Sequence, residues 1–283
     1  MTRLIESLAE IAEGYDALFC DLWGCYHDGL RPYQEAVAAL RAFRARGGRV
    51  LLLTNAPRPG FAVERHLAGM DAPPDSWDAI VSSGDASRAE AGRGRVGRRV
   101  EHVGPERDLP FFEGLDLARV PREEAEGVVL TGLYDDETET PEDYAEAVAD
   151  WRARGLPVLC ANPDVIVDRG DQRLYCAGAI AEAYAEAGGE VIHAGKPHAP
   201  IYRLAAERLA GLGGGAGRVL ALGDGIATDI AGGAAQGLDT LFVTGGLMAS
   251  AFGRDPERPD PAALERWVSE QPVRPDFAIG RLR

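Results

Sequence analysis

Residues 15–25 read YDALFCDLWGC, and this stretch decides the fold class that we predict for the chain. The apolar run from Ala17 to Cys20 is typical of a buried strand, and the carboxylate of Asp21 follows where that strand ends. Trp23 stands two positions later, and its indole cannot act as a general acid or base near neutral pH. The stretch therefore predicts a nucleophile at the carboxyl end of a strand and leaves open how a proton is moved there.

The chain of 283 residues has an ordinary globular composition, with 46% apolar and 27% charged residues. Its formal net charge of −15 and its pI near 4.8 argue against binding to nucleic acid or to an anionic membrane. The amino terminus contains no signal-peptide core, and the four cysteines show no metal-binding spacing. We therefore expect a cytoplasmic protein with reduced thiols, whose partner is a small molecule.

Strand-like and helix-like segments alternate along the chain, which predicts a doubly wound parallel α/β sheet. Around residues 91–99 Gly and Arg replace the apolar rhythm, which indicates a solvated connector to a second α/β block. The predicted strands are 15–20, 49–54, 79–81, 128–130, 157–160, 191–193, 219–222 and 240–243, and the predicted helices are 34–46, 140–154, 178–187 and 201–209.

Four predicted strands are followed by residues suited to phosphate chemistry, namely Asp21, Thr54, Lys196 and Asp224. The carboxyl ends of parallel strands lie at the same end of a sheet, so a single parallel sheet would bring these four residues together. A carboxylate such as Asp21 attacks phosphorus to give an aspartyl-phosphate, and two aspartates suit Mg²⁺. Lys196 offers a fixed positive charge, and Thr54 offers a hydroxyl donor.

This ordered set resembles the haloacid dehalogenase (HAD) superfamily, and more closely its NagD-like class IIA branch. The resemblance covers nearly the whole chain. Its four motifs are Asp21-Leu22-Trp23-Gly24, Thr54-Asn55, Gly195-Lys196-Pro197 and the segment from Gly223-Asp224 to Thr228-Asp229. The branch is also indicated by Asn162-Pro163-Asp164, Gly178-Ala179 and Pro275-Asp276-Phe277.

The resemblance implies a role for each matching residue. Asp21 is the nucleophile and a metal ligand, Thr54 donates to the phosphate, and Lys196 stabilises charge. Asp224 and the backbone carbonyl of Trp23 are further ligands of Mg²⁺, which Asp229 supports through water. Candidate substrate-binding residues are Thr54, Asn55, Asn162, Asp164 and Lys196.

The resemblance also implies a smaller α/β cap of the class IIA type, inserted between the second and third motifs. We expect the cap at residues 92–175 and the core at residues 1–91 and 176–283. A homodimer is an expectation from the resemblance alone. The predicted function is a Mg²⁺-dependent phosphatase acting on a small phosphorylated metabolite.

Trp23 departs from the phosphatase pattern, because an indole is no general acid or base near neutral pH. His27 or Asp28 is an alternative proton source, and a good leaving group would remove the need for one. Two other functions stay open: a HAD pseudoenzyme that binds phosphorylated metabolites without turnover, and a dehalogenase, in which halide leaves without a proton.

Overall fold

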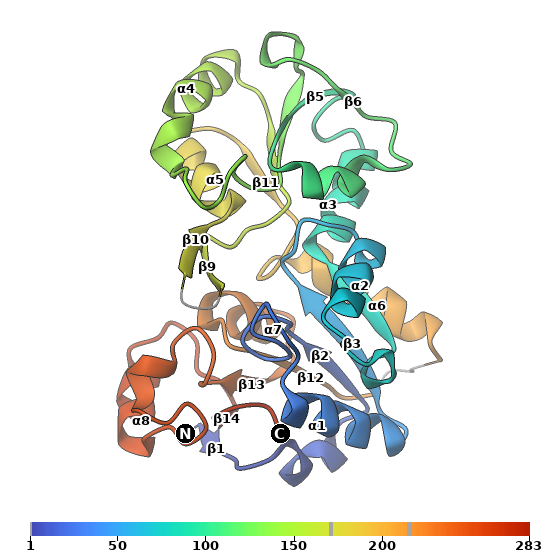
Figure 1. The fold of residues 1–283 in the computed structure, drawn as a ribbon, viewed down its shortest axis with the longest axis vertical. Helices are drawn as coiled ribbons and strands as arrows, with labels where there is room; N and C mark the ends of the chain where they lie inside the picture. Colours follow the sequence, from blue (N-terminus) through green and yellow to red (C-terminus); the bar gives the residue numbers. More distant parts are fainter. Residues whose placement is uncertain (1, 170–171, 214–216) are drawn as a thin grey trace. The chain divides into compact units, whose positions relative to one another are not determined.

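Strand β2 (Ala17–Cys20) lies inside a seven-stranded sheet, and its four side chains are buried. It pairs in parallel with β12 (Val219–Gly223) on one side and with β3 (Arg49–Thr54) on the other (Figure 1). The computed structural model describes residues 2–169, 172–213 and 217–283. A strand with neighbours on both sides and covered faces requires a continuous apolar run, which explains the sequence before Asp21.

The seven-stranded sheet and a set of helices build the larger part of the fold. Across the sheet the order is β1 (Arg3–Leu4), β14 (Phe277–Ile279), β13 (Asp239–Val243), β12, β2, β3 and β4 (Ala79–Ser82). The α-helices of the chain are α1 (Gln34–Ala45), α2 (Gly60–Gly69), α3 (Ser83–Gly92), α4 (Ala145–Arg154), α5 (Ala177–Glu186), α6 (Ala199–Gly211), α7 (Ala231–Ala235) and α8 (Pro261–Ser269).

A second sheet has five strands, and its printed pairs are all parallel. Its order is β11 (Val191–His193), β8 (Val158–Cys160), β7 (Gly127–Leu130), β5 (Arg99–Val103) and β6 (Ala118–Arg119). The antiparallel pair β9 (Ile166–Arg169) and β10 (Gln172–Tyr175) accompanies it. The predicted α/β fold class with parallel sheets is thus confirmed.

Short helices connect many of these elements. Pro141–Tyr144 (η6) precedes α4, and Thr140 forms its capping box with Asp143, at the start of the helix predicted for residues 140–154. The other short helices are η1 (Leu8–Glu10), η2 (Ala12–Gly14), η3 (Pro74–Ser76), η4 (Glu106–Phe112), η5 (Arg122–Glu124), the π-helix η7 (Ile226–Ile230) and η8 (Ala249–Phe252).

The chain divides into two compact units. The first unit contains residues up to Thr54, Glu64–Val81 and Tyr202–Arg283, and the second contains Asn55–Val63 and Ser82–Ile201. The expected cap, residues 92–175, lies within the second unit, and its role as a cap stays a prediction. The second unit extends beyond residue 175 because β11 pairs with β8 and α5 packs into the core of the second sheet.

Each unit has a hydrophobic core of its own. In the second unit, the fully buried Trp151 packs edge-to-face against Tyr184. In the first unit, Phe242 is fully buried and stacks on Trp267 at 5.4 Å between ring centroids. Both units therefore bury aromatic side chains on their own sheets.

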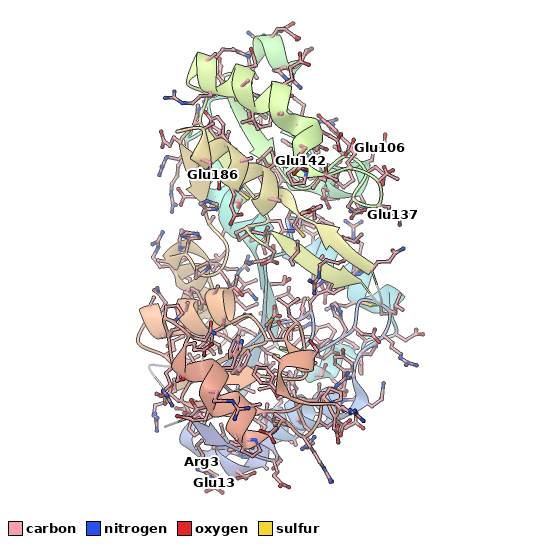
Figure 2. All side chains as sticks on the ribbon, turned by 90° about the vertical axis from the view of Figure 1, so that its left-hand side faces the viewer. Arg3, Glu13, Glu106, Glu137, Glu142 and Glu186 are labelled. Carbon is pink, nitrogen blue, oxygen red and sulfur yellow. The ribbon has the colours of Figure 1, made fainter. Side chains whose placement is uncertain are left out.

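Many acidic side chains of the chain lie on its surface. Figure 2 labels Glu106, Glu137, Glu142 and Glu186 of the second unit, and all four are exposed. The arginines of the basic stretch pair with acids, for example Arg93 with Glu90 and Arg98 with Asp116, the latter at 2.6 Å. Within the described residues, none of the helices is both long enough and apolar enough to span a bilayer.

Candidate active site

Three adjacent strands of the seven-stranded sheet end in predicted site residues. Asp21 follows β2 directly, Thr54 is the last residue of β3, and Asp224 follows β12 directly. The Asp21 backbone N–H donates to the carbonyl of Leu222 at 2.9 Å, which extends the strand ladder to the nucleophile itself. Asp21 and Thr54 are buried, with 7% and 2% of their surfaces exposed. Strand pairing thus holds these three candidate site residues at the carboxyl ends of neighbouring strands.

The carboxylates of Asp21 and Asp224 come together with the thiol of Cys25. One oxygen of each carboxylate and the Cys25 Sγ all lie within 4.8 Å of one another. Burial above all, and then the nearby carboxylates of Asp224 and Asp21, raise the pKa of the Cys25 thiol well above its ordinary value. Two carboxylates at this separation repel one another, so the cluster favours a cation.

The Asp224 carboxylate is held by tightly packed backbone. Its Oδ2 accepts a hydrogen bond of 2.7 Å from the Leu247 N–H. A Cβ added at Gly24 or at Gly246 would lie 2.0 or 2.1 Å from the same oxygen. Only residues without a side chain allow this approach, so both glycines contribute to the orientation of Asp224.

Asp229 lies in the π-helix η7 and is not a member of this three-residue cluster. Its Oδ2 accepts hydrogen bonds from the Gly225 N–H at 3.2 Å and from the Thr228 hydroxyl at 3.3 Å. These contacts fix the loop that carries Asp224. The structure therefore gives Asp229 a supporting position, and its link to a metal through water stays a prediction.

Trp23 packs on the turn that follows it. Its ring lies edge-on to the His27 ring at 5.2 Å, and the two residues form an isolated parallel bridge. His27 is 1% exposed, and burial lowers its pKa to about 4. Its Nδ1 accepts from the Gly29 N–H at 2.9 Å, so the neutral ring carries its proton on Nε2. His27 therefore has no imidazolium proton to give near neutral pH.

Asp28 is also poorly suited to replace the missing acid. Burial acts to raise its pKa, but the N–H groups of Arg31 and Leu30 outweigh that effect and hold the pKa below its ordinary value. Both N–H groups donate to Asp28 Oδ1, at 2.8 and 2.9 Å. Asp28 is thus ionised near neutral pH, and neither alternative proton source is supported.

Lys196 is placed by the second unit, which corrects one expectation. Its preceding strand β11 belongs to the five-stranded sheet, in register with Val158–Cys160, and not to the sheet that carries Asp21. The prediction of one sheet for all four motifs was therefore wrong. Lys196 is buried, with 2% of its surface exposed.

Asn55 fastens the Lys196 loop. Its Oδ1 accepts from the Lys196 N–H at 2.8 Å, and its Nδ2 donates to the Lys196 carbonyl at 3.2 Å and to Asp164 Oδ1 at 2.8 Å. A Cβ at Gly195 would lie 2.7 Å from Asn55 Oδ1, so glycine is required for this approach. Both N–H donors of Asn55 are used, which favours a positioning role over substrate contact.

Asn162 and Asp164 belong to one tight turn after β8. The Asp164 N–H donates to Asn162 Oδ1 at 3.2 Å, and the Gly178 N–H at the start of α5 donates to the Asp164 carbonyl at 3.1 Å. The structure thus joins Asn162, Asp164 and Asn55 within the second unit. Substrate binding by these residues stays a prediction.

A buried polar group at the ends of β5 and β7 was missed by the sequence analysis. Asp108 is 3% exposed, and burial raises its pKa to about 6. Its Oδ1 lies 3.6 Å from Arg58 Nε, and Thr131 hydrogen-bonds to its side chain. His102 Nε2 and the Thr131 hydroxyl are 2.9 Å apart. These residues are far apart in sequence and share no motif, so no local signal could have found the group.

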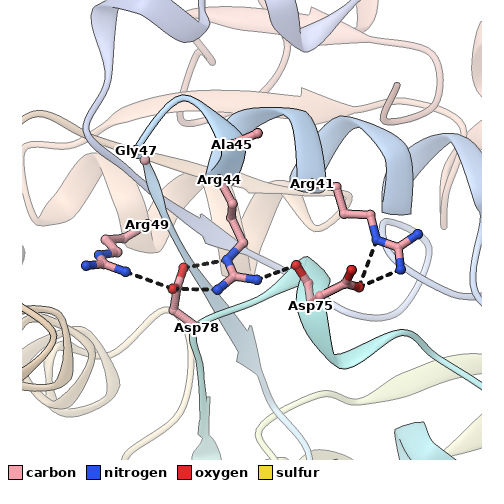
Figure 3. A pocket seen from close by; sticks show the side chains of 8 residues that line it. Arg41, Arg44, Ala45, Gly47, Arg49, Asp75 and Asp78 are labelled. Carbon is pink, nitrogen blue, oxygen red and sulfur yellow. Dashed lines mark hydrogen bonds and ion pairs between the residues drawn. The ribbon is translucent and has the colours of Figure 1, made fainter.

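A cavity of about 460 Å³ lies at the opposite end of β3, where Arg49 begins the strand. Figure 3 shows its side chains joined in ion pairs, with Arg44 and Arg49 on Asp78 at 2.8 and 3.1 Å. Arg41 pairs with Asp75 in the same way. Because each of these three arginines already pairs with one of the two aspartates, we interpret the cavity as part of a structural network.

Comparisons with known proteins identify the family. A family model described as "haloacid dehalogenase-like hydrolase" matches residues 18–118. A second family model, described as "HAD-hydrolase-like", matches residues 193–265. A crystal structure of a haloacid dehalogenase-like hydrolase from Brucella suis 1330 is 41% identical, with a TM-score of 0.88. The match covers 99% of this chain and 100% of the Brucella suis chain. The chain belongs to the haloacid dehalogenase-like hydrolases.

Other solved structures agree with this assignment. A glycerol phosphate phosphatase from Mycobacterium tuberculosis, in complex with magnesium, is 28% identical over 97% of this chain and 77% of its own, with a TM-score of 0.69. A p-nitrophenyl phosphatase from Archaeoglobus fulgidus, 23% identical over 94% of this chain and 96% of its own, shares the fold with a TM-score of 0.72. The predicted NagD-like resemblance is confirmed. No curated protein matched the chain.

Proposed function

We propose that the protein is a Mg²⁺-dependent phosphatase that hydrolyses a small phosphorylated metabolite through an aspartyl-phosphate on Asp21. The observation that carries the proposal is the meeting of the Asp21 and Asp224 carboxylates at the end of adjacent buried strands. Membership of a hydrolase family supports it, and so does the likeness to phosphatases. The cytoplasmic location and the homodimer stay predictions.

The donor set fits a magnesium ion. Asp21 and Asp224 offer hard carboxylate oxygens, and the hydrogen bond from Leu247 fixes one Asp224 oxygen in place. The Trp23 carbonyl completes the proposed ligand set, since a backbone carbonyl is unaffected by the change of side chain. When bound, Mg²⁺ would offset the repulsion between the phosphate and the attacking carboxylate.

The chain's own residues perform two displacements. An Asp21 oxygen forms a bond to phosphorus while the ester P–O bond breaks, and the leaving oxygen takes up a proton. Water then attacks the phosphorus of the aspartyl-phosphate, which releases phosphate and regenerates the Asp21 carboxylate. In this proposal, Thr54 donates a hydrogen bond to the transferring group, and motif order assigns the stabilising positive charge to Lys196.

Protonation of the leaving oxygen determines which substrates we expect the enzyme to prefer. Trp23 provides no acid, His27 is neutral and Asp28 is ionised, so the leaving oxygen must depart with little assistance. We therefore infer that the enzyme favours phosphate esters with acidic leaving groups, such as aryl phosphates, over simple alkyl esters.

A panel of phosphate esters assayed with and without Mg²⁺ tests the proposal. We expect phosphate release that needs both the metal and Asp21, and a fall of at least about 10³-fold in Asp21→Asn because the nucleophile is lost. The exposed Asp116→Asn is the matched control and should retain full activity.

The other outcomes separate the alternatives. A phosphorylated metabolite that raises the melting temperature but is not consumed would favour the pseudoenzyme. Metal-independent chloride release from a haloacid would favour the dehalogenase. Either result, together with no Asp21-dependent phosphate release, would overturn the proposal.

A further inference from the structure

Cys25 introduces a sulfur atom into a site otherwise built from oxygen. Its Sγ lies within 4.8 Å of a carboxylate oxygen of both Asp21 and Asp224, and only 1% of the residue is exposed. Mg²⁺ takes oxygen ligands, so the Cys25 thiol is a donor that the proposed magnesium site does not use. The cluster therefore favours a cation that binds sulfur as well as oxygen, unlike Mg²⁺.

Two carboxylates and one thiolate form a ligand set of mixed hardness. Zinc binds thiolate sulfur at about 2.3 Å and carboxylate oxygen at about 2.0–2.2 Å, which places such ligands about 3.5 Å apart around a tetrahedral ion. The observed upper limit of 4.8 Å allows this arrangement after a small contraction. Divalent ions late in the first transition row also bind mixed sites more tightly than Mg²⁺ or Mn²⁺ do.

A second thiol nearby in the sequence is oriented differently. The Cys20 Sγ donates to the backbone carbonyl of Asp21 at 3.2 Å and is not a member of the three-residue cluster. Cys25 is therefore the sulfur ligand that the geometry supports. All four cysteines are buried thiols, so Cys160 in the second unit offers a matched control.

We propose that Asp21, Cys25 and Asp224 form a binding site for a thiophilic divalent cation of the zinc, cobalt and cadmium class. Coordination exchanges the S–H bond of Cys25 for a sulfur–metal bond, and the proton leaves to water. Such an ion shares two ligands with the proposed magnesium site and excludes Mg²⁺ from it. Only this competition rests on the proposed function; the binding itself does not.

Cd²⁺ titration of the metal-free protein, followed by ultraviolet absorption, tests the site directly. We expect a thiolate-to-metal charge-transfer band in the wild type and in Cys160→Ser, and no band in Cys25→Ser. The affinity for Cd²⁺ should fall at least about tenfold in Cys25→Ser, because one of three protein ligands changes from sulfur to a hydroxyl. Mg²⁺ affinity should not fall, because Mg²⁺ takes oxygen ligands and does not use the Cys25 sulfur.

A measurement on the wild type alone guards against a variant that does not fold. The ¹¹³Cd resonance of the loaded protein should fall in the range of sulfur-coordinated cadmium. A resonance in the range of pure oxygen coordination, or an equal charge-transfer band in a folded Cys25→Ser, would overturn the proposal. Phosphatase failure would leave these readouts unchanged, so the two proposals are tested separately.

Discussion

At the scale of single residues, Trp23 decides how the proposed chemistry is limited. In the proposed mechanism its backbone carbonyl binds the metal, while its side chain packs on His27 and carries no titratable proton. The structure also disfavours His27 and Asp28 as substitutes, because one is neutral and the other is ionised. The Trp23 side chain thus removes the proton donor of the proposed mechanism without changing the backbone carbonyl that would bind the metal.

Replacing Trp23 by Asp should therefore restore an acid. We expect Trp23→Asp to raise kcat about 10²-fold or more for alkyl phosphates and by less for aryl phosphates, whose leaving groups need little protonation. The dependence of kcat on leaving-group pKa should flatten accordingly. Trp23→Phe, which adds no acid, should retain the steep dependence. Unchanged or lower rates in a folded Trp23→Asp would show that Trp23 does not simply occupy the acid position.

At the scale of elements, parallel strand ends organise the polar residues of both sheets. In the first sheet they place Asp21, Thr54 and Asp224, and in the second they place the buried Asp108 group beside β5 and β7. The sequence places strands β3 and β11 at their observed bounds, but it assigns β11 to the wrong sheet.

Asp108 should give the second unit a distinct pH dependence. Its folded pKa of about 6 exceeds the ordinary value near 3.9, so between these pH values the folded state binds a proton that the unfolded state lacks. This contribution stabilises the fold below about pH 4 and is lost as the pH rises through about 6. The difference is at most about 3 kcal/mol.

Urea unfolding of Asp108→Asn checks this sign. Relative to the wild type, the variant should become more stable by about 2–3 kcal/mol as the pH rises from 4 to 7, because asparagine cannot ionise. The exposed Asp116→Asn should show no such trend. A constant difference between Asp108→Asn and the wild type across this range would contradict the expectation.

At the scale of the whole molecule, two units with separate cores should unfold separately. Trp151 anchors the second unit, where its indole N–H donates to Glu101 Oε2 at 2.6 Å. Phe242 anchors the first unit through its stack on Trp267. Cores that share no cluster give cooperative units of their own.

Calorimetry of two core variants tests this division. Trp151→Phe removes one of two donors to the buried Glu101 carboxylate, which keeps the hydrogen bond from Arg122. Phe242→Leu loses aromatic packing, and each variant should cost about 2–4 kcal/mol. We expect two thermal transitions, of which each variant lowers only one. A single transition that both variants lower equally would show that the units unfold together.

The sequence alone determined the parallel α/β class and most strand positions, because apolar runs are local signals. It also indicated Asp21, Thr54, Lys196 and Asp224 as candidate site residues, because each follows or ends such a run or its loop. Tertiary structure alone decided that Lys196 follows a strand of the second sheet, that Asn55 holds its loop, and that Cys25 joins the two aspartates. These facts depend on strand pairing and close packing between distant segments, which a one-dimensional pattern does not specify.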